Sequence, residues 1–171
     1  MGSEARVAAP DSNTGNVIRD SALGLVPETL EHYLPLNAAV WDDGALSAAE
    51  IEMARLRNAG HTGCAFCQAV RYDVAIADGL EEDTVTRLRG DIGASGLSER
   101  EQLILRFVDQ YALDPGGMPA ELQAALQEHF SAAELMHLSL LVAYFNGFSR
   151  CAVALGGMPD EMPHMEISVP R

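Results

Sequence analysis

The sequence predicts an all-α protein built as a helical bundle. Three Ser-x-x-Glu capping boxes mark helix starts at Ser47, Ser98 and Ser131, because both side chains of such a box bind free backbone N–H groups at a helix N-terminus. Each box is followed by apolar residues at helical spacing, and no run alternates with the period of two typical of a half-buried strand. A chain of 171 residues is long enough to bury a core as one domain.

In the first half of the chain, capping residues and glycines divide the periodic runs into four helices. A helix at 27–41 precedes the first capping box, and a helix at 47–60 follows that box up to a break at Gly63. We expect a third helix at 64–78, directly after this glycine, and a fourth at 81–89, with a glycine on either side.

The second half is expected to hold three more helices. The helix at 98–113 starts at the second capping box and ends before the turn sequence Asp-Pro-Gly-Gly at 114–117. A helix at 119–129 follows, and the last, 131–155, starts at the third capping box and is expected to bend near Gly147.

The chain contains an internal repeat. The segment "SAAEIEMARLRNAGHTGCAFC" (47–67) aligns with "SAAELMHLSLLVAYFNGFSRC" (131–151) at a constant offset of 84, with the cap residues, a glycine and the final cysteine in register. We interpret it as a duplicated helix–turn–helix unit. Because Phe148 stands in the second copy where the first has Cys64, we expect the chemistry in the first copy and Cys151 as a small buried residue.

Composition and tail sequences suggest the domain organisation. Residues 1–22 are polar and are expected to form a mobile N-terminal tail, whereas 23–157 form the single helical domain. The proline-containing segment 158–171 is expected to be an extended C-terminal arm, laid on the body or on a neighbouring subunit.

The charge balance limits the partners. A formal net charge of −14 repels phosphate backbones and anionic lipids, so we expect no nucleic-acid and no membrane partner. The most apolar stretch, 138–145, is shorter than the roughly 18 residues of a membrane span. The first residues lack the apolar core of a secretory signal, and the three cysteines form no stapling framework; both favour the reducing cytoplasm.

Cys64, Cys67 and Arg71 carry the most informative spacing. In the expected helix 64–78 they share one face, since they lie three and four residues apart. A thiol in the first helical turn lies near free N–H groups and the positive end of the helix dipole, and a nearby arginine adds charge; all three favour the thiolate.

Glu52 lies twelve residues before Cys64, on a mostly apolar stripe of its helix. It is either a partly buried carboxylate suited to proton transfer or one neutralised by a cation, which Arg55 could supply. The cysteines could also be half of a zinc site with His61, or two inert core residues. Because no second Cys/His pair at ligand spacing is present, we expect no metal.

These residues carry a family resemblance. Glu52, eleven intervening residues and the pair Cys64-x-x-Cys67 are similar in type and spacing to the redox branch of the alkylhydroperoxidase D / carboxymuconolactone decarboxylase family. The phrases "LRNAGHTGCAFCQAVRYDVAIADGL" and "LSLLVAYFNGFSRCAVALG" also resemble it, and the likeness covers about residues 25–157. It implies an all-helical bundle that assembles into homo-oligomers: dimers, trimers or hexamers.

The resemblance also implies a chemistry. Cys67 would attack a hydroperoxide, Cys64 would resolve the product, and Glu52 would take part in a proton relay. The family places a histidine at the position of Arg71, and arginine cannot give up a proton at a workable pH. Either Glu52, acting through water, or His61 would then supply the proton.

We therefore expect a thiol-dependent oxidoreductase that reduces organic hydroperoxides without a metal or bound cofactor. An external dithiol, a lipoyl carrier or a thioredoxin-like protein, would restore the cysteine pair. One alternative is a decarboxylase or lyase acting on a small lactone or carboxylic acid, with Arg71 holding the substrate carboxylate. A second alternative is a non-catalytic redox sensor.

Overall fold

The computed structural model describes residues 4–171 and confirms the all-α class, to which it adds one short pair of strands. The first three residues of the expected tail lie outside the described residues. In chain order the elements are η1 (Ala22–Leu25), α1 (Pro27–Asp42), α2 (Ala48–Thr62), α3 (Ala65–Ala69), β1 (Val70–Tyr72), α4 (Asp73–Ala77), α5 (Glu82–Arg87), η2 (Ile92–Ala94), α6 (Glu99–Leu113), α7 (Ala120–His129), α8 (Ala132–Leu155) and β2 (Met165–Ile167).

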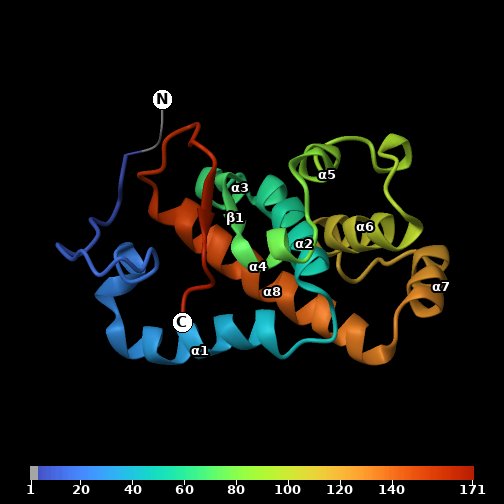
Figure 1. The fold of residues 1–171 in the computed structure, drawn as a ribbon, viewed down its shortest axis with the longest axis horizontal. Helices are drawn as coiled ribbons and strands as arrows, with labels where there is room; N and C mark the ends of the chain where they lie inside the picture. The colour runs from blue at the N-terminus through green and yellow to red at the C-terminus, as the bar shows by residue number, and fades with distance from the viewer. Residues whose placement is uncertain (1–3) are drawn as a thin grey trace.

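Helix α2 lies at the centre of the bundle, packed against α8 on one side and α6 on the other. Figure 1 shows α8 crossing the length of the molecule, with α5, α6 and α7 gathered at one end and the N-terminal segment at the other. Ile51 of α2, Leu105 of α6 and Leu141 of α8 are fully buried where these helices meet. Residues 51–56 of α2 are all buried, so the helix that leads to the cysteines is fixed in the core.

All three expected capping boxes are present. In each, the serine hydroxyl accepts the N–H of the glutamate three residues on, and that glutamate binds the serine N–H in return. Arg100 connects two of the boxes, because its guanidinium lies 2.6 Å from Glu50 at the start of α2 and 2.6 Å from Glu134 at the start of α8. Arg100 thus connects the N-terminus of α2 to the N-terminus of α8.

The prediction of a continuous helix over 64–78 is wrong. The chain forms the short helix α3, leaves the helical conformation at Val70, and resumes as α4 only at Asp73. The interruption is β1, which pairs in parallel with β2 of the C-terminal arm, Val70 opposite Met165 and Tyr72 opposite Ile167. A strand partner about ninety-five residues away thus overrides the local helical pattern. The expected helix 81–89 is also shorter, as α5.

The repeat is only partly a repeat of structure. Both copies begin as capped helices, α2 and α8. The first copy turns at Gly63, which adopts the left-handed conformation (φ 67°) that favours glycine. In the second copy α8 runs through Gly147 without interruption to Leu155, so the helix–turn–helix form is confined to the first copy.

Both terminal segments lie on the body of the domain. Beyond β2, the amide of Asn37 donates to the carbonyl of Pro170 at 2.9 Å, and Arg171 pairs with Asp42. The N-terminal segment reaches the end of α8 through Arg6, and Figure 1 shows it beside the C-terminal arm. The mobility expected of residues 1–22 stays a prediction.

Helix α8 is long and apolar enough to span a membrane by length and composition, with a mean hydropathy of 1.4. In the bundle, however, Leu138, Leu141 and Val142 of α8 are fully buried. We therefore interpret α8 as the core helix of a soluble fold.

Candidate functional site

Cys64 and Cys67 lie where α2 turns into α3. Gly63 ends α2, and Cys64 is the N-cap of α3, its sulfur accepting the N–H of Cys67 at 3.2 Å. The two sulfur atoms are 2.13 Å apart and form a disulfide. Cys64 is fully buried and Cys67 is partly exposed, so only the second sulfur is open to a small molecule.

The exposed side of Cys67 faces an apolar cavity of about 440 Å³. Phe66, Tyr72 and Phe148 contribute to its walls, together with Ser149 of α8. The Ser149 hydroxyl donates to the sulfur of Cys67 at 3.4 Å and is itself almost completely buried. This is the one side-chain hydrogen bond to the Cys67 sulfur among the described residues.

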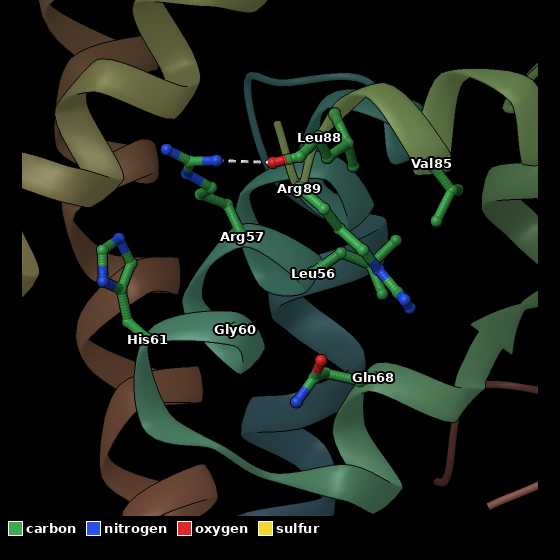
Figure 2. A pocket seen from close by; sticks show the side chains of 8 residues that line it. All are labelled: Leu56, Arg57, Gly60, His61, Gln68, Val85, Leu88 and Arg89. Carbon is green, nitrogen blue, oxygen red and sulfur yellow. Dashed lines mark hydrogen bonds between the residues drawn. The ribbon is translucent and has the colours of Figure 1, made fainter. Parts of the chain in front are cut away.

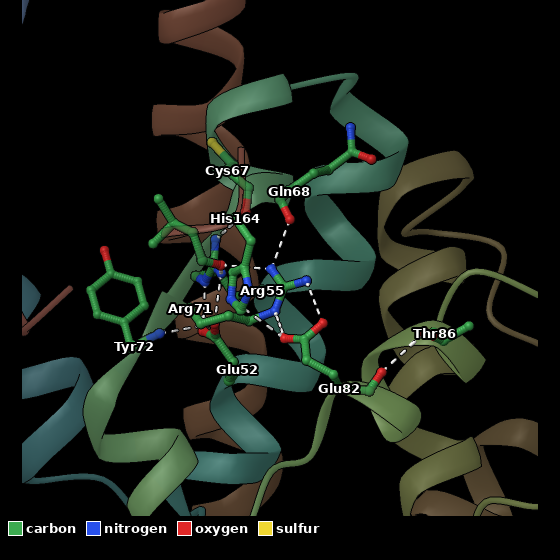
Figure 3. Close-up of polar contacts among 10 residues, drawn as sticks. Glu52, Arg55, Cys67, Gln68, Arg71, Tyr72, Glu82, Thr86 and His164 are labelled. Atoms are coloured by element: carbon green, nitrogen blue, oxygen red, sulfur yellow. Dashed lines mark hydrogen bonds and ion pairs between the residues drawn. The ribbon is translucent and has the colours of Figure 1, made fainter. Parts of the chain in front are cut away.

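Glu52 and Arg55 form a buried ion pair beside the cysteines. The carboxylate of Glu52, fully buried, accepts two hydrogen bonds from the Arg55 guanidinium at 2.6 and 2.7 Å, and a weaker one from the Tyr72 N–H. Arg55 also donates to the carbonyls of Cys67 (2.6 Å) and Val70 (2.7 Å), as Figure 3 shows. The pair therefore fixes the backbone at the end of the Cys-x-x-Cys segment to the core helix α2.

The protonation states within this group follow from burial and charge. Burial alone would lower the pKa of Arg55, but the charge of Glu52 and its hydrogen bonds raise that pKa above its ordinary value. Burial raises the pKa of Tyr72, whose ring lies 5.2 Å from the Arg55 guanidinium carbon. Tyr72, which contributes to the cavity lining, therefore carries its proton at neutral pH.

His61 lies at a different place. Its Nε2 is 2.6 Å from Asp109, which also binds Arg57 at 2.6 Å. Burial acts to raise the pKa of Asp109, but the hydrogen bonds and charges of Arg57 and His61 outweigh it and lower that pKa. His61 lines a separate cavity of about 310 Å³ together with Gln68 and Arg89 (Figure 2).

Arg71 does not share a helical face with the cysteines, because it lies on β1 rather than on a helix. Its side chain is almost fully buried, pairs with Glu82 at 2.6 Å, and donates to the carbonyls of Gln68 and Val70 (Figure 3). It does not line the cavity at Cys67. The structure thus brings Cys64, Cys67, Glu52 and Arg55 together and separates Arg71 and His61 from the Cys67 sulfur.

The site contains two side chains that the sequence reasoning did not single out. Ser149 is eighty-two positions from Cys67 and carries no motif, so nothing local signals its contact with the sulfur. Tyr72 lies on β1, within the segment 64–78 that the sequence predicts as helix, so its position at the site has no local signal. Among the residues that the structure describes, no group of three or more His, Cys, Asp or Glu side chains could hold a metal ion.

A helical bundle with a Cys-x-x-Cys pair at the turn after its central helix, backed by a glutamate, is an alkylhydroperoxidase D-like fold. The profile of the carboxymuconolactone decarboxylase family matches residues 27–110, a range that holds Glu52 and both cysteines. Over this range, just under half of its 171 residues, the chain matches the carboxymuconolactone decarboxylase family.

Solved structures support the fold. A protein of unknown function from Agrobacterium tumefaciens, described as a candidate antioxidant defence protein AhpD, superposes with a TM-score of 0.69 at 22% identity, over 89% of this chain and 95% of that one. An uncharacterised peroxidase-related protein from Ralstonia eutropha, described as an alkylhydroperoxidase AhpD core, gives 0.70 at 18%, over 81% and 74%. A peroxidase-related protein from Silicibacter gives 0.70 at 17%, over 88% and 89%. No curated protein matches the sequence.

Proposed function

We propose that this protein is a thiol-dependent peroxidase that reduces organic hydroperoxides through Cys67 and Cys64. The observation that carries the proposal is the position of Cys67: its sulfur opens on an apolar cavity, while its partner sulfur is buried within bonding distance. The match to the family and the peroxidase-related names of proteins with this fold support the same chemistry.

The cycle begins with the Cys67 thiolate attacking one peroxide oxygen. The O–O bond breaks, the sulfur becomes a sulfenic acid, and the other oxygen leaves as an alkoxide that takes up a proton. The thiol of Cys64 then displaces water from the sulfenic acid and forms the disulfide. An external dithiol reduces this disulfide by exchange and is itself oxidised to a disulfide.

The proton for the leaving oxygen needs a donor at the cavity. Both oxygens of Glu52 are held by Arg55, whereas Ser149 and Tyr72, which carry hydroxyl groups, contribute to the cavity lining. We propose that Glu52 acts through Arg55 as a positioning residue, and that these hydroxyl groups pass a proton from solvent to the alkoxide.

The lyase alternative required a free Arg71 to hold a substrate carboxylate. Arg71 is bound to Glu82 and to two carbonyls, so no observation favours that function. For the same reason an Arg71→His variant, which carries the family's histidine, should not gain peroxide turnover. A gain would mean that position 71 reaches the reacting atoms after all.

The proposal is tested by incubating the reduced protein with cumene hydroperoxide and counting free thiols and peroxide consumed. Repeated turnover with dithiothreitol, dihydrolipoamide or reduced thioredoxin is expected, and comparing the last two identifies the class of the reductant. Cys67→Ser should abolish turnover, and Cys151→Ser, at the equivalent position of the second repeat copy, is the matched control that should retain it. Loss of thiols without turnover would indicate a redox sensor, and no reaction at Cys67 would refute the proposal.

We also propose that the protein acts in the cytoplasm as a homo-oligomer assembled through α8. Met136 and Leu140 on this helix are 65% and 45% exposed, and Ala143 and Gly147 continue the same face. Leu140→Glu should lower the mass measured by light scattering. Leu113→Glu, which alters an isolated exposed leucine at the end of α6, should not.

A further inference from the structure

The two ends of the chain form the outer wall of the cavity at Cys67, which remains partly open to solvent. Side chains from 5–9 and 17–23 form one part of this outer wall, and side chains from 155–162 form the other. The inner wall comes from the core elements that carry Cys67 and Ser149. The volume of about 440 Å³ lies within the roughly 300–1,000 Å³ typical of small-molecule sites.

The first anchor of the outer wall is at the end of α8. The Arg6 N–H donates to the carbonyl of Leu155 at 2.7 Å, and its guanidinium donates to that of Ala154 at 2.6 Å. Carbonyls at a helix C-terminus lack intrahelical partners and attract positive charge. Gly157 adopts a positive φ of 79°, and a Cβ there would lie 2.8 Å from the Cβ of Ala5, so the two terminal segments meet at a point that requires glycine.

The second anchor holds the segment further along. The carboxylate of Asp20 accepts the backbone N–H groups of Thr14 (2.9 Å) and Gly15 (3.0 Å), and the Thr14 N–H is the main cause of the lowered pKa of Asp20. Arg19 pairs with Glu31 of α1 at 3.2 Å. Two hydrogen bonds from Arg6 therefore hold this wall against α8, and one ion pair holds it against α1.

The lining of the cavity separates into an apolar part and a polar end. The N-terminal segment contributes mainly apolar side chains (Val7, Val17, Ile18 and Leu23) and one hydroxyl residue, Ser21, whereas Cys67, Tyr72 and Ser149 belong to the core elements. Among the described residues, Arg55 is the one charged side chain in the lining, and its guanidinium is already bound to Glu52 and two carbonyls. An ionised ligand would therefore find no free counter-charge.

We propose that the N-terminal segment 5–23 is the specificity-determining wall of the site and binds the hydrocarbon tail of an uncharged hydroperoxide. The peroxide group would lie at Cys67 and the tail along Val7 and Ile18. This inference rests on the proposed peroxidase function, but it makes a claim about binding that can be tested without turnover.

Trp41 provides the readout. It is the single tryptophan of the chain, and its ring lies 4.5 Å from that of Tyr72 and 6.0 Å from that of Phe145, both of which line the cavity. Titration with 1-decanol, an uncharged and unreactive probe, should change Trp41 fluorescence saturably, whereas decanoate should bind more weakly. Absence of any saturable response to 1-decanol in the wild type would overturn the proposal.

Val7→Asp places a carboxylate in the wall and should weaken decanol binding about tenfold. Val26→Asp is the matched control, because both valines are exposed (40% and 46%) but Val26 does not line the cavity. Val7→Phe, which keeps the wall apolar, should reduce binding of decanol more than of tert-butanol. Equal decanol affinities in Val7→Asp and Val26→Asp would overturn the proposal.

A kinetic comparison separates the wall from the peroxidase function. In Val7→Asp the ratio of kcat/KM for cumene hydroperoxide to that for hydrogen peroxide should fall about tenfold. An unchanged ratio would refute the specificity role of segment 5–23 without contradicting the proposed peroxidase function. Failure of the wild type to reduce any peroxide, together with decanol binding that depends on Val7, would refute the peroxidase and support the wall.

Discussion

Replacing Ser149 by alanine should make Cys67 a poorer nucleophile with little effect on the fold. The Ser149 hydroxyl is the donor 3.4 Å from the Cys67 sulfur, and it is only 5% exposed. In the reduced protein this donor stabilises the thiolate more than the thiol, because a hydrogen bond to an ion is stronger than one to a neutral group. Ser149→Ala removes the donor without adding bulk.

The size of the effect follows from the type of hydrogen bond. A hydrogen bond to a charged group contributes about 1.5–3 kcal/mol. We expect the lower end of this range, because Cys67 is partly exposed and water can replace part of the lost interaction. About 1.4 kcal/mol corresponds to one pH unit, so the midpoint of thiolate formation should rise by about one unit.

The assay is the rate of alkylation by iodoacetamide as a function of pH. In a Cys64→Ser, Cys151→Ser background Cys67 is the only thiol, and serine at position 64 keeps an N-cap oxygen for α3. Ser139→Ala on the same helix is the matched control, since its hydroxyl makes no hydrogen bond to any described residue. Coincident pH profiles for Ser149→Ala and Ser139→Ala would refute the assignment of Ser149 to the thiolate.

Two further predictions concern stability. Arg55→Ala leaves the Glu52 carboxylate buried and unpaired, so the free energy of unfolding in urea should fall by about 3–5 kcal/mol, and a much smaller loss would show that Glu52 is not desolvated. The pKa of Glu134 is lowered from 4.5 to about 2, mainly by hydrogen bonds from Ser131 and then by one from Arg100. The ionised carboxylate therefore stabilises the fold fully above about pH 4.5, and this contribution is lost as the pH falls through about 2. Denaturation of the wild type and of Glu134→Gln should therefore differ near neutral pH and converge in acid; a constant difference would contradict the linkage.

Local signals predicted most of the bundle. Capping boxes at Ser47, Ser98 and Ser131 fix their helix starts through contacts within four residues, which is why those boundaries are accurate to about one residue. The prediction of a helix over 64–78 is wrong because the conformation of this segment depends on pairing with β2, and no local sequence pattern indicates where β2 lies in space. A strand of three residues is also too short to show its own periodicity.

The site divides in the same way. Glu52 and the two cysteines lie close together because a short helix–turn–helix segment carries all three. The pairing of Arg55 with Glu52 could be predicted because the two residues are three positions apart on one helix. The separation of Arg71 from the sulfurs and the contact of Ser149 with Cys67 both depend on packing between distant segments. Sequence spacing alone does not contain that information.

The cross-link between Cys64 and Cys67 joins residues only three apart. So small a ring restrains very little of the unfolded chain, because the stabilisation from closing a loop grows with the number of residues enclosed. The surrounding architecture is held instead by the Arg55 ion pair and by strand pairing. Two electrons can therefore enter or leave at this position while the remainder of the molecule keeps its shape, so heat denaturation of the oxidised and dithiol forms should take place at nearly the same temperature.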